Sequence, residues 1–131
     1  PITRSAYCFA CGNLGSRMIG TISVFASSWP SLGGSTTSFT FFVFSDDINW
    51  ARENFLPSFP VVYVDINGPD DAHQDLWLMA SCKNFIIANS SFSWWGAWLC
   101  ENPQKIVIAP KRWFKSDESI RDLLPIDWVK L

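Results

Sequence analysis

The sequence contains one histidine, His73, and four cysteines, and it has neither a long apolar run nor an excess of basic residues. A structural zinc site needs four ligands, and the single Cys-x-x-Cys pair, Cys8 and Cys11, has no second pair, so we expect no metal. No apolar stretch reaches the roughly 18 residues that a membrane span requires. The formal net charge of −2 supplies no basic field, which argues against a nucleic-acid partner.

The two remaining cysteines, Cys82 and Cys100, fall on apolar stretches that have a helical pattern. A free cysteine in such a place behaves as a small hydrophobic residue. The beginning of the chain also lacks the charged and apolar pattern of a signal peptide. We therefore expect reduced thiols and an intracellular location.

The chain divides by composition at about residue 39. Residues 1–38 are rich in Ser, Gly, Thr and Ala and show no sustained period, so we assign them no structure and regard them as a disordered or out-of-context leader. Residues 39–131 have the pattern of one ordered domain. Eight Trp residues suit either a core or a surface on which sugar rings stack, and the count alone does not decide.

Short apolar runs alternate with helix-like stretches from Phe39 onward. Strands are expected at 39–44, 61–66, 85–88 and 106–109, with helices at 48–55, 71–83, 91–100 and 117–124. This alternation predicts an α/β fold with a Rossmann-like parallel sheet and helices on both faces. The helix over 71–83 is apolar nearly all round, so we expect it to be well buried.

A polar junction, Asn89-Ser90-Ser91, lies between a predicted strand and a predicted helix. Its free backbone N–H groups and hydroxyls suit a phosphate, although Ser91 or Ser93 could instead only cap the helix. Ligands bind beyond the carboxyl ends of parallel strands. Other polar groups expected at those ends are Ser45-Asp46-Asp47, Asp65 and Lys111-Arg112. Because polar groups are expected at several strand ends of one sheet edge, we favour a phosphate site over a helix cap.

Four stretches resemble glycosyltransferase family 11, the α-1,2-fucosyltransferases. They are FVFSDDINW (42–50), DLWLMASCK (75–83), IIANSSFSWWGAWL (86–99) and KIVIAPKRWF (105–114). The resemblance covers about residues 39–131. It implies the C-terminal, GDP-sugar-binding lobe of a GT-B-type enzyme that transfers fucose from GDP-fucose to the 2-hydroxyl of a galactoside. It also implies inversion, no metal and no cofactor besides the donor substrate.

The resemblance further implies a galactose-containing glycan as acceptor. Bacterial members work in the cytoplasm and animal members in the Golgi, so we expect a cytoplasmic, bacterial-type protein, with peripheral membrane association left open. The family's His-x-Arg-Arg-Gly-Asp motif is absent, so the catalytic residues stay unassigned. We expect a truncated fragment that does not transfer fucose alone. The alternative is a non-catalytic nucleotide- or carbohydrate-binding module.

The candidate donor-binding residues follow from the junction and the strand ends. They are Asp46, Asp75, Asn89, Ser90, Ser91 and Phe92. Ser91 is expected to contact the diphosphate, and Asp75 to accept hydrogens from guanine or ribose, unless it only provides charge at a helix start. Asp46 could face the donor, whereas Asp47 is expected to cap a helix. Lys111 and Arg112 could balance the diphosphate or lie in a solvated loop, and Trp94, Trp95 and Trp98 are expected in the core.

Overall fold

The computed structural model describes residues 22–30, 37–114 and 122–131, with side chains from residue 40 onward except Pro69. The elements are β1 (Ile22–Pro30), β2 (Thr37–Ser45), α2 (Ile48–Asn54), β3 (Val61–Tyr63), the 3₁₀ helix η1 (Pro69–Asp71), α3 (Ala72–Ala80), β4 (Asn84–Ile86), α4 (Ser91–Trp98), β5 (Ile106–Ala109) and β6 (Val129–Lys130). The predicted α/β alternation is confirmed from β2 onward. Cys8, Cys11 and most of the helix expected at 117–124 lie outside the described residues.

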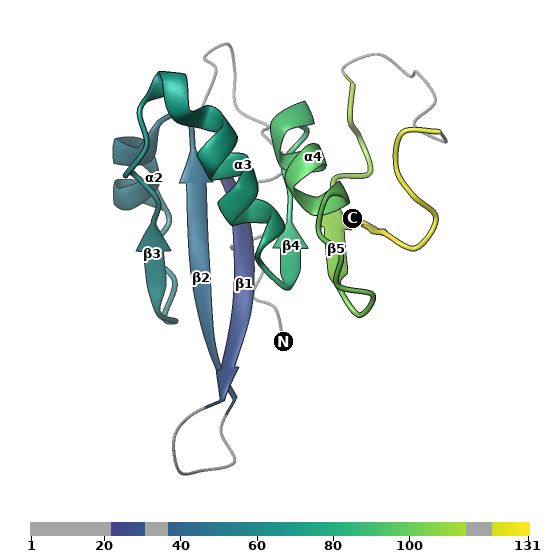
Figure 1. Ribbon diagram of the computed structural model, residues 1–131, viewed down its shortest axis with the longest axis horizontal. Helices are drawn as coiled ribbons and strands as arrows, with labels where there is room; N and C mark the ends of the chain where they lie inside the picture. The colour runs from purple at the N-terminus through teal and green to yellow at the C-terminus, as the bar shows by residue number, and fades with distance from the viewer. Residues whose placement is uncertain (1–21, 31–36, 115–121) are drawn as a thin grey trace.

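The sheet has six strands in the order β3-β2-β1-β4-β5-β6 (Figure 1). The pairs β2–β3, β4–β5 and β5–β6 are parallel, and β1 is antiparallel to both of its neighbours, β2 and β4. The four predicted strands therefore all run in the same direction, as expected, but the antiparallel strand β1, which the sequence did not predict, lies between β2 and β4. Only six residues, 31–36, connect β1 to β2. A link of that length joins antiparallel neighbours, because a parallel crossover takes a dozen residues or more.

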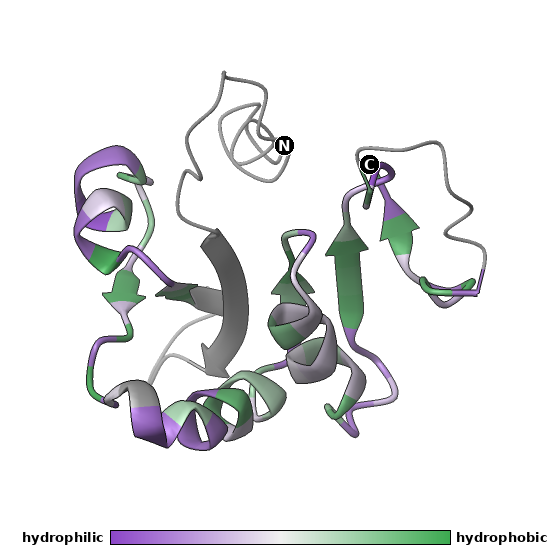
Figure 2. Ribbon diagram, turned by 90° about the horizontal axis from the view of Figure 1, so that it is seen from above, coloured by the Kyte–Doolittle hydropathy of each residue, from purple (hydrophilic) through white to green (hydrophobic). Residues whose placement is uncertain are grey.

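Helices cover both faces of the sheet, as the sequence predicts. Figure 2, a view from above, shows α2 on one side of the strands and α3 and α4 on the other. Successive side chains of β2 point to opposite faces. Val43 packs with Ala51 and Phe55 on the α2 side, while Phe44 belongs to the larger core with Met79. Strand β2 thus contributes to two cores, one on each face of the sheet.

The starts of α2 and α3 show how acidic side chains act at helix ends. Asp47 Oδ1 accepts the backbone N–H of Trp50 at 3.0 Å, which confirms the predicted cap. At α3 the Asp71 side chain makes no cap hydrogen bond to the backbone, and Gln74 Nε2 donates to Asp71 Oδ1 at 3.0 Å instead.

Helix α3 is less buried than its composition predicts. Met79 is buried in the core, but Trp77 is 73% exposed. One side of the helix packs on the sheet and on α4, and Trp77 lies on the side that has no such neighbour. An apolar sequence all round the helix therefore does not give burial all round it.

A lysine holds the carboxyl end of α4. Lys105 Nζ donates to the carbonyl oxygens of Ala97 at 2.8 Å, Trp98 at 3.3 Å and Cys100 at 2.7 Å. These are the carbonyls that a helix end leaves without an intrahelical partner, and a cation there also interacts favourably with the helix dipole. The last turn of α4 is thereby fixed against the beginning of β5.

Of the three tryptophans of α4, only Trp94 belongs to the core. Its Nε1 donates to the Leu123 carbonyl at 2.9 Å, and its ring stacks on Trp98 at 5.0 Å and tilts against Trp128 at 5.9 Å. Trp95 and Trp98 are 49% and 50% exposed. The expectation of a core position is therefore wrong for those two, because they face away from the sheet.

Replacing Trp94 by alanine should lower the free energy of unfolding by about 3 kcal/mol or more, since a packed aromatic side chain and a hydrogen bond are lost together. Trp98→Ala, at a half-exposed position, should cost about half as much. Urea denaturation of both variants would measure the difference. Equal losses would contradict the central position of Trp94.

Candidate functional site

The chain leaves the two halves of the sheet in opposite directions. From β2 it passes through α2 to β3, and from β4 it passes through α4 to β5, on the other side of β1. The carboxyl ends of β2 and β4 therefore flank a topological switch point, where open α/β sheets bind ligands. Because β1 lies between them, these two strand ends are about 10 Å apart.

The serine junction follows β4 at this edge. Ser90 occupies the N-cap position of α4 in extended conformation, but its side chain makes no cap hydrogen bond. Ser91 is exposed and is the first residue of the helix, and Ser93, two residues further on, is buried. The N-cap residue is therefore Ser90, and neither Ser91 nor Ser93 occupies that position. The amino end of α4 presents backbone N–H groups without a side-chain cap.

Asn89 attaches the junction to the loop after β5. Its Nδ2 donates to the Trp113 carbonyl at 3.2 Å. The exposed side chains of Lys111 and Arg112 lie in the same loop, just before Trp113. Two cationic residues therefore belong to a segment that is tied to the start of α4. Phe92, in the first turn, is 37% exposed.

Asp75 lies in the first turn of α3 and is partly buried. Its Oδ1 accepts a hydrogen bond from Asn67 Nδ2 at 2.6 Å. Helices α3 and α4 lie side by side on one face of the sheet (Figures 1 and 2). They meet at Gly96, where an added Cβ would lie 2.8 Å from Met79 Cβ.

The contact at Gly96 sets the height of the two helices relative to each other. One turn toward the amino end of each helix leads from Met79 to Asp75 and from Gly96 to Phe92. Asp75 and Phe92 thus both lie in the first turns of their helices, one turn before the contact at Gly96. The structure thus brings Asp75 and the serine junction to the same edge of the sheet.

The acidic groups after β2 and β3 have different surroundings. Asp46 is exposed at the end of β2, two strand positions from β4. Asp65, which the sequence also placed at this edge, pairs with Arg52 of α2 at 3.3 Å.

Among the described residues, no group of three or more His, Cys, Asp or Glu side chains could hold a metal ion. No helix in the described part is long and apolar enough to cross a membrane.

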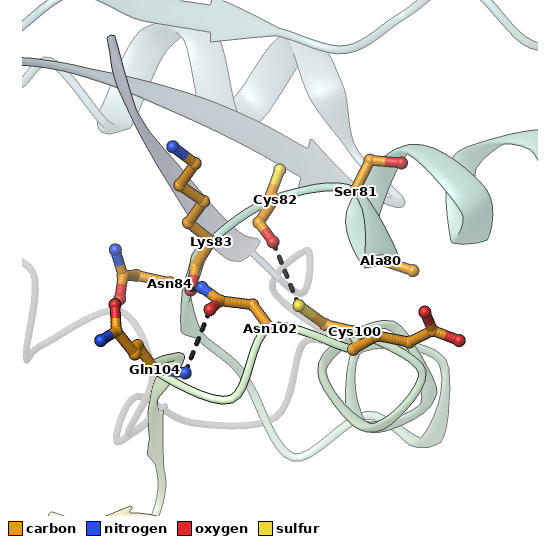
Figure 3. Close-up of a pocket in the computed structure, with 9 residues that line it drawn as sticks. Ala80, Ser81, Cys82, Lys83, Asn84, Cys100, Asn102 and Gln104 are labelled. Atoms are coloured by element: carbon orange, nitrogen blue, oxygen red, sulfur yellow. Dashed lines mark hydrogen bonds between the residues drawn. The ribbon is translucent and has the colours of Figure 1, made fainter. Parts of the chain in front are cut away.

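A cleft of about 560 Å³ opens at the opposite edge, at the amino ends of β4 and β5 (Figure 3). Its lining residues are Ala80, Ser81, Cys82, Lys83, Asn84, Cys100, Glu101, Asn102 and Gln104. Two of its amides serve the fold: Asn84 Oδ1 accepts the Ile106 N–H at 3.2 Å, and Asn102 Nδ2 donates to the Lys83 carbonyl at 3.4 Å. The cleft is separate from the switch-point edge.

Cys82 and Cys100 are both free and buried, as expected of packed thiols. The Cys100 thiol donates to the Cys82 carbonyl, with Sγ 3.3 Å from the oxygen (Figure 3). Burial, and to a smaller extent the neighbouring Cys100, raises the pKa of Cys82 from its ordinary 9.0 to about 11. Cys82 is therefore a protonated, unreactive thiol at neutral pH.

Open α/β sheets typically bind ligands at such a switch point. The comparisons with known proteins give the family of this chain. The model of glycosyl transferase family 11 matches residues 15–131, so the chain belongs to that family. The match begins upstream of Phe39, where the resemblance was placed from the sequence, and it includes β1.

Two bacterial relatives are similar to most of the described chain. An alpha-1,2-colitosyltransferase of Escherichia coli is 46% identical over 96 residues, which are 70% of this chain and 32% of that protein. The O-antigen biosynthesis glycosyltransferase WbnK of Escherichia coli is 44% identical over 91 residues, 68% of this chain and 29% of that protein. The aligned part is thus just under a third of each relative. No solved structure shows significant similarity to the chain.

Alanine at position 96 should push α3 and α4 apart, because its Cβ would lie 2.8 Å from Met79 Cβ. We expect Gly96→Ala to cost about 1–3 kcal/mol of stability, as overpacking does. Gly68→Ala is the matched control, since nothing lies within 4 Å of its Cβ position. Thermal or urea unfolding measures both, and an unchanged midpoint for Gly96→Ala would contradict the close contact.

The raised pKa of Cys82 should appear in the pH dependence of stability. Above pH 9 the unfolded thiol loses its proton, while the folded one keeps it up to about pH 11. The stabilisation is therefore complete below pH 9 and is lost as the pH rises to 11. Chemical denaturation across this range should show a steeper loss for the unchanged chain than for Cys82→Ala. Parallel curves would contradict the shift.

Proposed function

We propose that this chain forms the donor-binding part of a glycosyltransferase and binds a nucleoside diphosphate sugar at the carboxyl edge of β4. The observation that carries the proposal is the uncapped amino end of α4, with Ser90 and Ser91, at the switch point of the sheet. Helix amino ends favour anions through their free N–H groups and dipole. Membership of glycosyl transferase family 11 supports the same substrate class.

In this proposal the diphosphate accepts hydrogen bonds from the first backbone N–H groups of α4 and from the Ser91 hydroxyl. Lys111 and Arg112, which are exposed in the loop tied to Asn89, contribute positive charge on the β5 side. Asp75 accepts hydrogens from the nucleoside, beside the first turn of α4. Asn89 and Phe92 flank the diphosphate, and Asp46 borders the site at the end of β2.

The proposed donor is GDP-fucose, and the proposed reaction is transfer of fucose to the 2-hydroxyl of a galactose-containing glycan, with inversion and without a metal. The leaving diphosphate would then be stabilised by helix N–H groups and cationic side chains. The relative named an alpha-1,2-colitosyltransferase supports the α-1,2 linkage. The relative named for O-antigen biosynthesis supports a bacterial glycan as the setting. The proposed place of action is the cytoplasm, at the membrane periphery.

The test is isothermal titration calorimetry of the chain with GDP. Ser91→Ala should weaken GDP binding by roughly 1–2 kcal/mol, about 5- to 30-fold, since a hydroxyl donor to a charged group is removed. The matched control is Ser81→Ala, an exposed serine whose hydroxyl donates to the Trp77 carbonyl at the opposite end of the helices. Its affinity should not change. An unchanged affinity in Ser91→Ala would remove Ser91 from the site.

A further inference from the structure

Asn67 holds the carboxylate of Asp75 in place from a neighbouring segment. It lies between β3 and η1 and is partly buried, and its Nδ2 donates to Asp75 Oδ1 at 2.6 Å. The segment itself is fixed just beyond Asn67, where the Asp71 N–H donates to the Gly68 carbonyl at 2.9 Å. Asn67 is therefore part of a turn that approaches α3 at a defined position.

The hydrogen bond uses one oxygen of the carboxylate and leaves the other. A carboxylate has two oxygens, each of which can accept hydrogens, and the side-chain amide of Asn67 donates to Oδ1 only. Hydrogen bonds to an ionised group are short and strongly oriented, and the 2.6 Å distance from Asn67 Nδ2 to Asp75 Oδ1 is of this kind. The plane of the Asp75 carboxylate is thereby fixed, and Oδ2 stays available as an acceptor.

We propose that Asn67 is a positioning residue that orients Asp75 so that its second oxygen accepts a hydrogen from the nucleoside of the donor. This inference rests on the proposed function. Asp75 lies in the first turn of α3, and α3 packs against α4, at whose first turn the diphosphate is proposed to bind. A carboxylate repels phosphate but accepts N–H and O–H hydrogens, so the group beside Asp75 is the nucleoside.

A double-mutant cycle on GDP binding separates positioning from a general structural role. The variants are Asn67→Ala, Asp75→Ala and the two combined, in the full chain. Each single change should raise the dissociation constant of GDP by about tenfold, the loss of one hydrogen bond to a charged group. Because Asn67 acts through Asp75, the double variant should bind no more weakly than Asp75→Ala.

Asn54→Ala is the matched control. It removes another side-chain amide that donates a hydrogen bond, from Asn54 Nδ2 to the Trp50 carbonyl at 2.9 Å. It lies on α2, across the sheet from Asp75, and should leave GDP affinity unchanged. Denaturation midpoints of all variants show which remain folded, and only folded variants enter the cycle.

Two results would overturn the inference while the proposed function stands. One is an unchanged GDP affinity in folded Asn67→Ala, and the other is a double variant in which the two losses add. If the unchanged chain does not bind GDP, the inference and the proposed function fall together. Inosine diphosphate and 2′-deoxy-GDP, which lack the guanine amino group and a ribose hydroxyl, separate the base from the sugar. If Asp75 binds the group that one analogue lacks, Asn67→Ala should leave the affinity for that analogue unchanged while it still weakens GDP binding. This result supports the inference.

Discussion

The close contact of α3 and α4 at Gly96 is the constraint on which the candidate site depends. A side chain at this position would meet Met79 at 2.8 Å, so glycine sets the distance between the helices. The contact holds α3, with Asp75 in its first turn, next to α4, which begins at the serine junction. Lys105 holds the other end of α4 through three carbonyls. The serine junction is therefore carried by a helix that is fixed in its middle and at its end.

Strand β1 connects the two halves of the sheet. It pairs with β2 along its whole length and with β4 over three residues, Val24 to Ala26. Without it, β2 and β4 would have no shared ladder. Its first residue, Ile22, pairs with Ser45 at the end of β2, so the amino end of β1 lies at the switch-point edge. The family match also includes this strand, which agrees with its place in the middle of the sheet.

The parts of the fold that depend on neighbouring residues were predictable from the sequence. The strand at 106–109 and the Asp47 cap of α2 have local causes, an apolar run and an acidic residue before a helix. Strand β1 was missed because its small and polar residues, such as Ser27 and Ser28, give no clear period, and its strand form depends on pairing with β2. Propensity is overridden there by tertiary context.

Some residues of the candidate site could likewise be predicted from the sequence, and others could not. The strand-to-helix junction with its serines is visible in the sequence, and so is Asp75 as an acidic residue in a first turn. Asn67 and Lys105 could not be found, because each acts on atoms brought near by the fold: an aspartate eight residues away, and the end of another element. Likewise the exposure of Trp77 or Trp98 depends on which side of a helix has a neighbour, and an all-apolar helix carries no signal for that.

The order of groups along the edge also constrains how a donor would lie. With the nucleoside beside Asp75 and the diphosphate at α4, the donor runs from the α3 side toward the loop after β5, where Lys111 and Arg112 are exposed. The transferred sugar would then lie beyond the diphosphate, away from α3. Asp46, at the end of β2, is on the α3 side of β4 in the sheet order. In this arrangement Asp46 borders the nucleoside half of the donor, and a direct role at the reacting carbon does not fit its position.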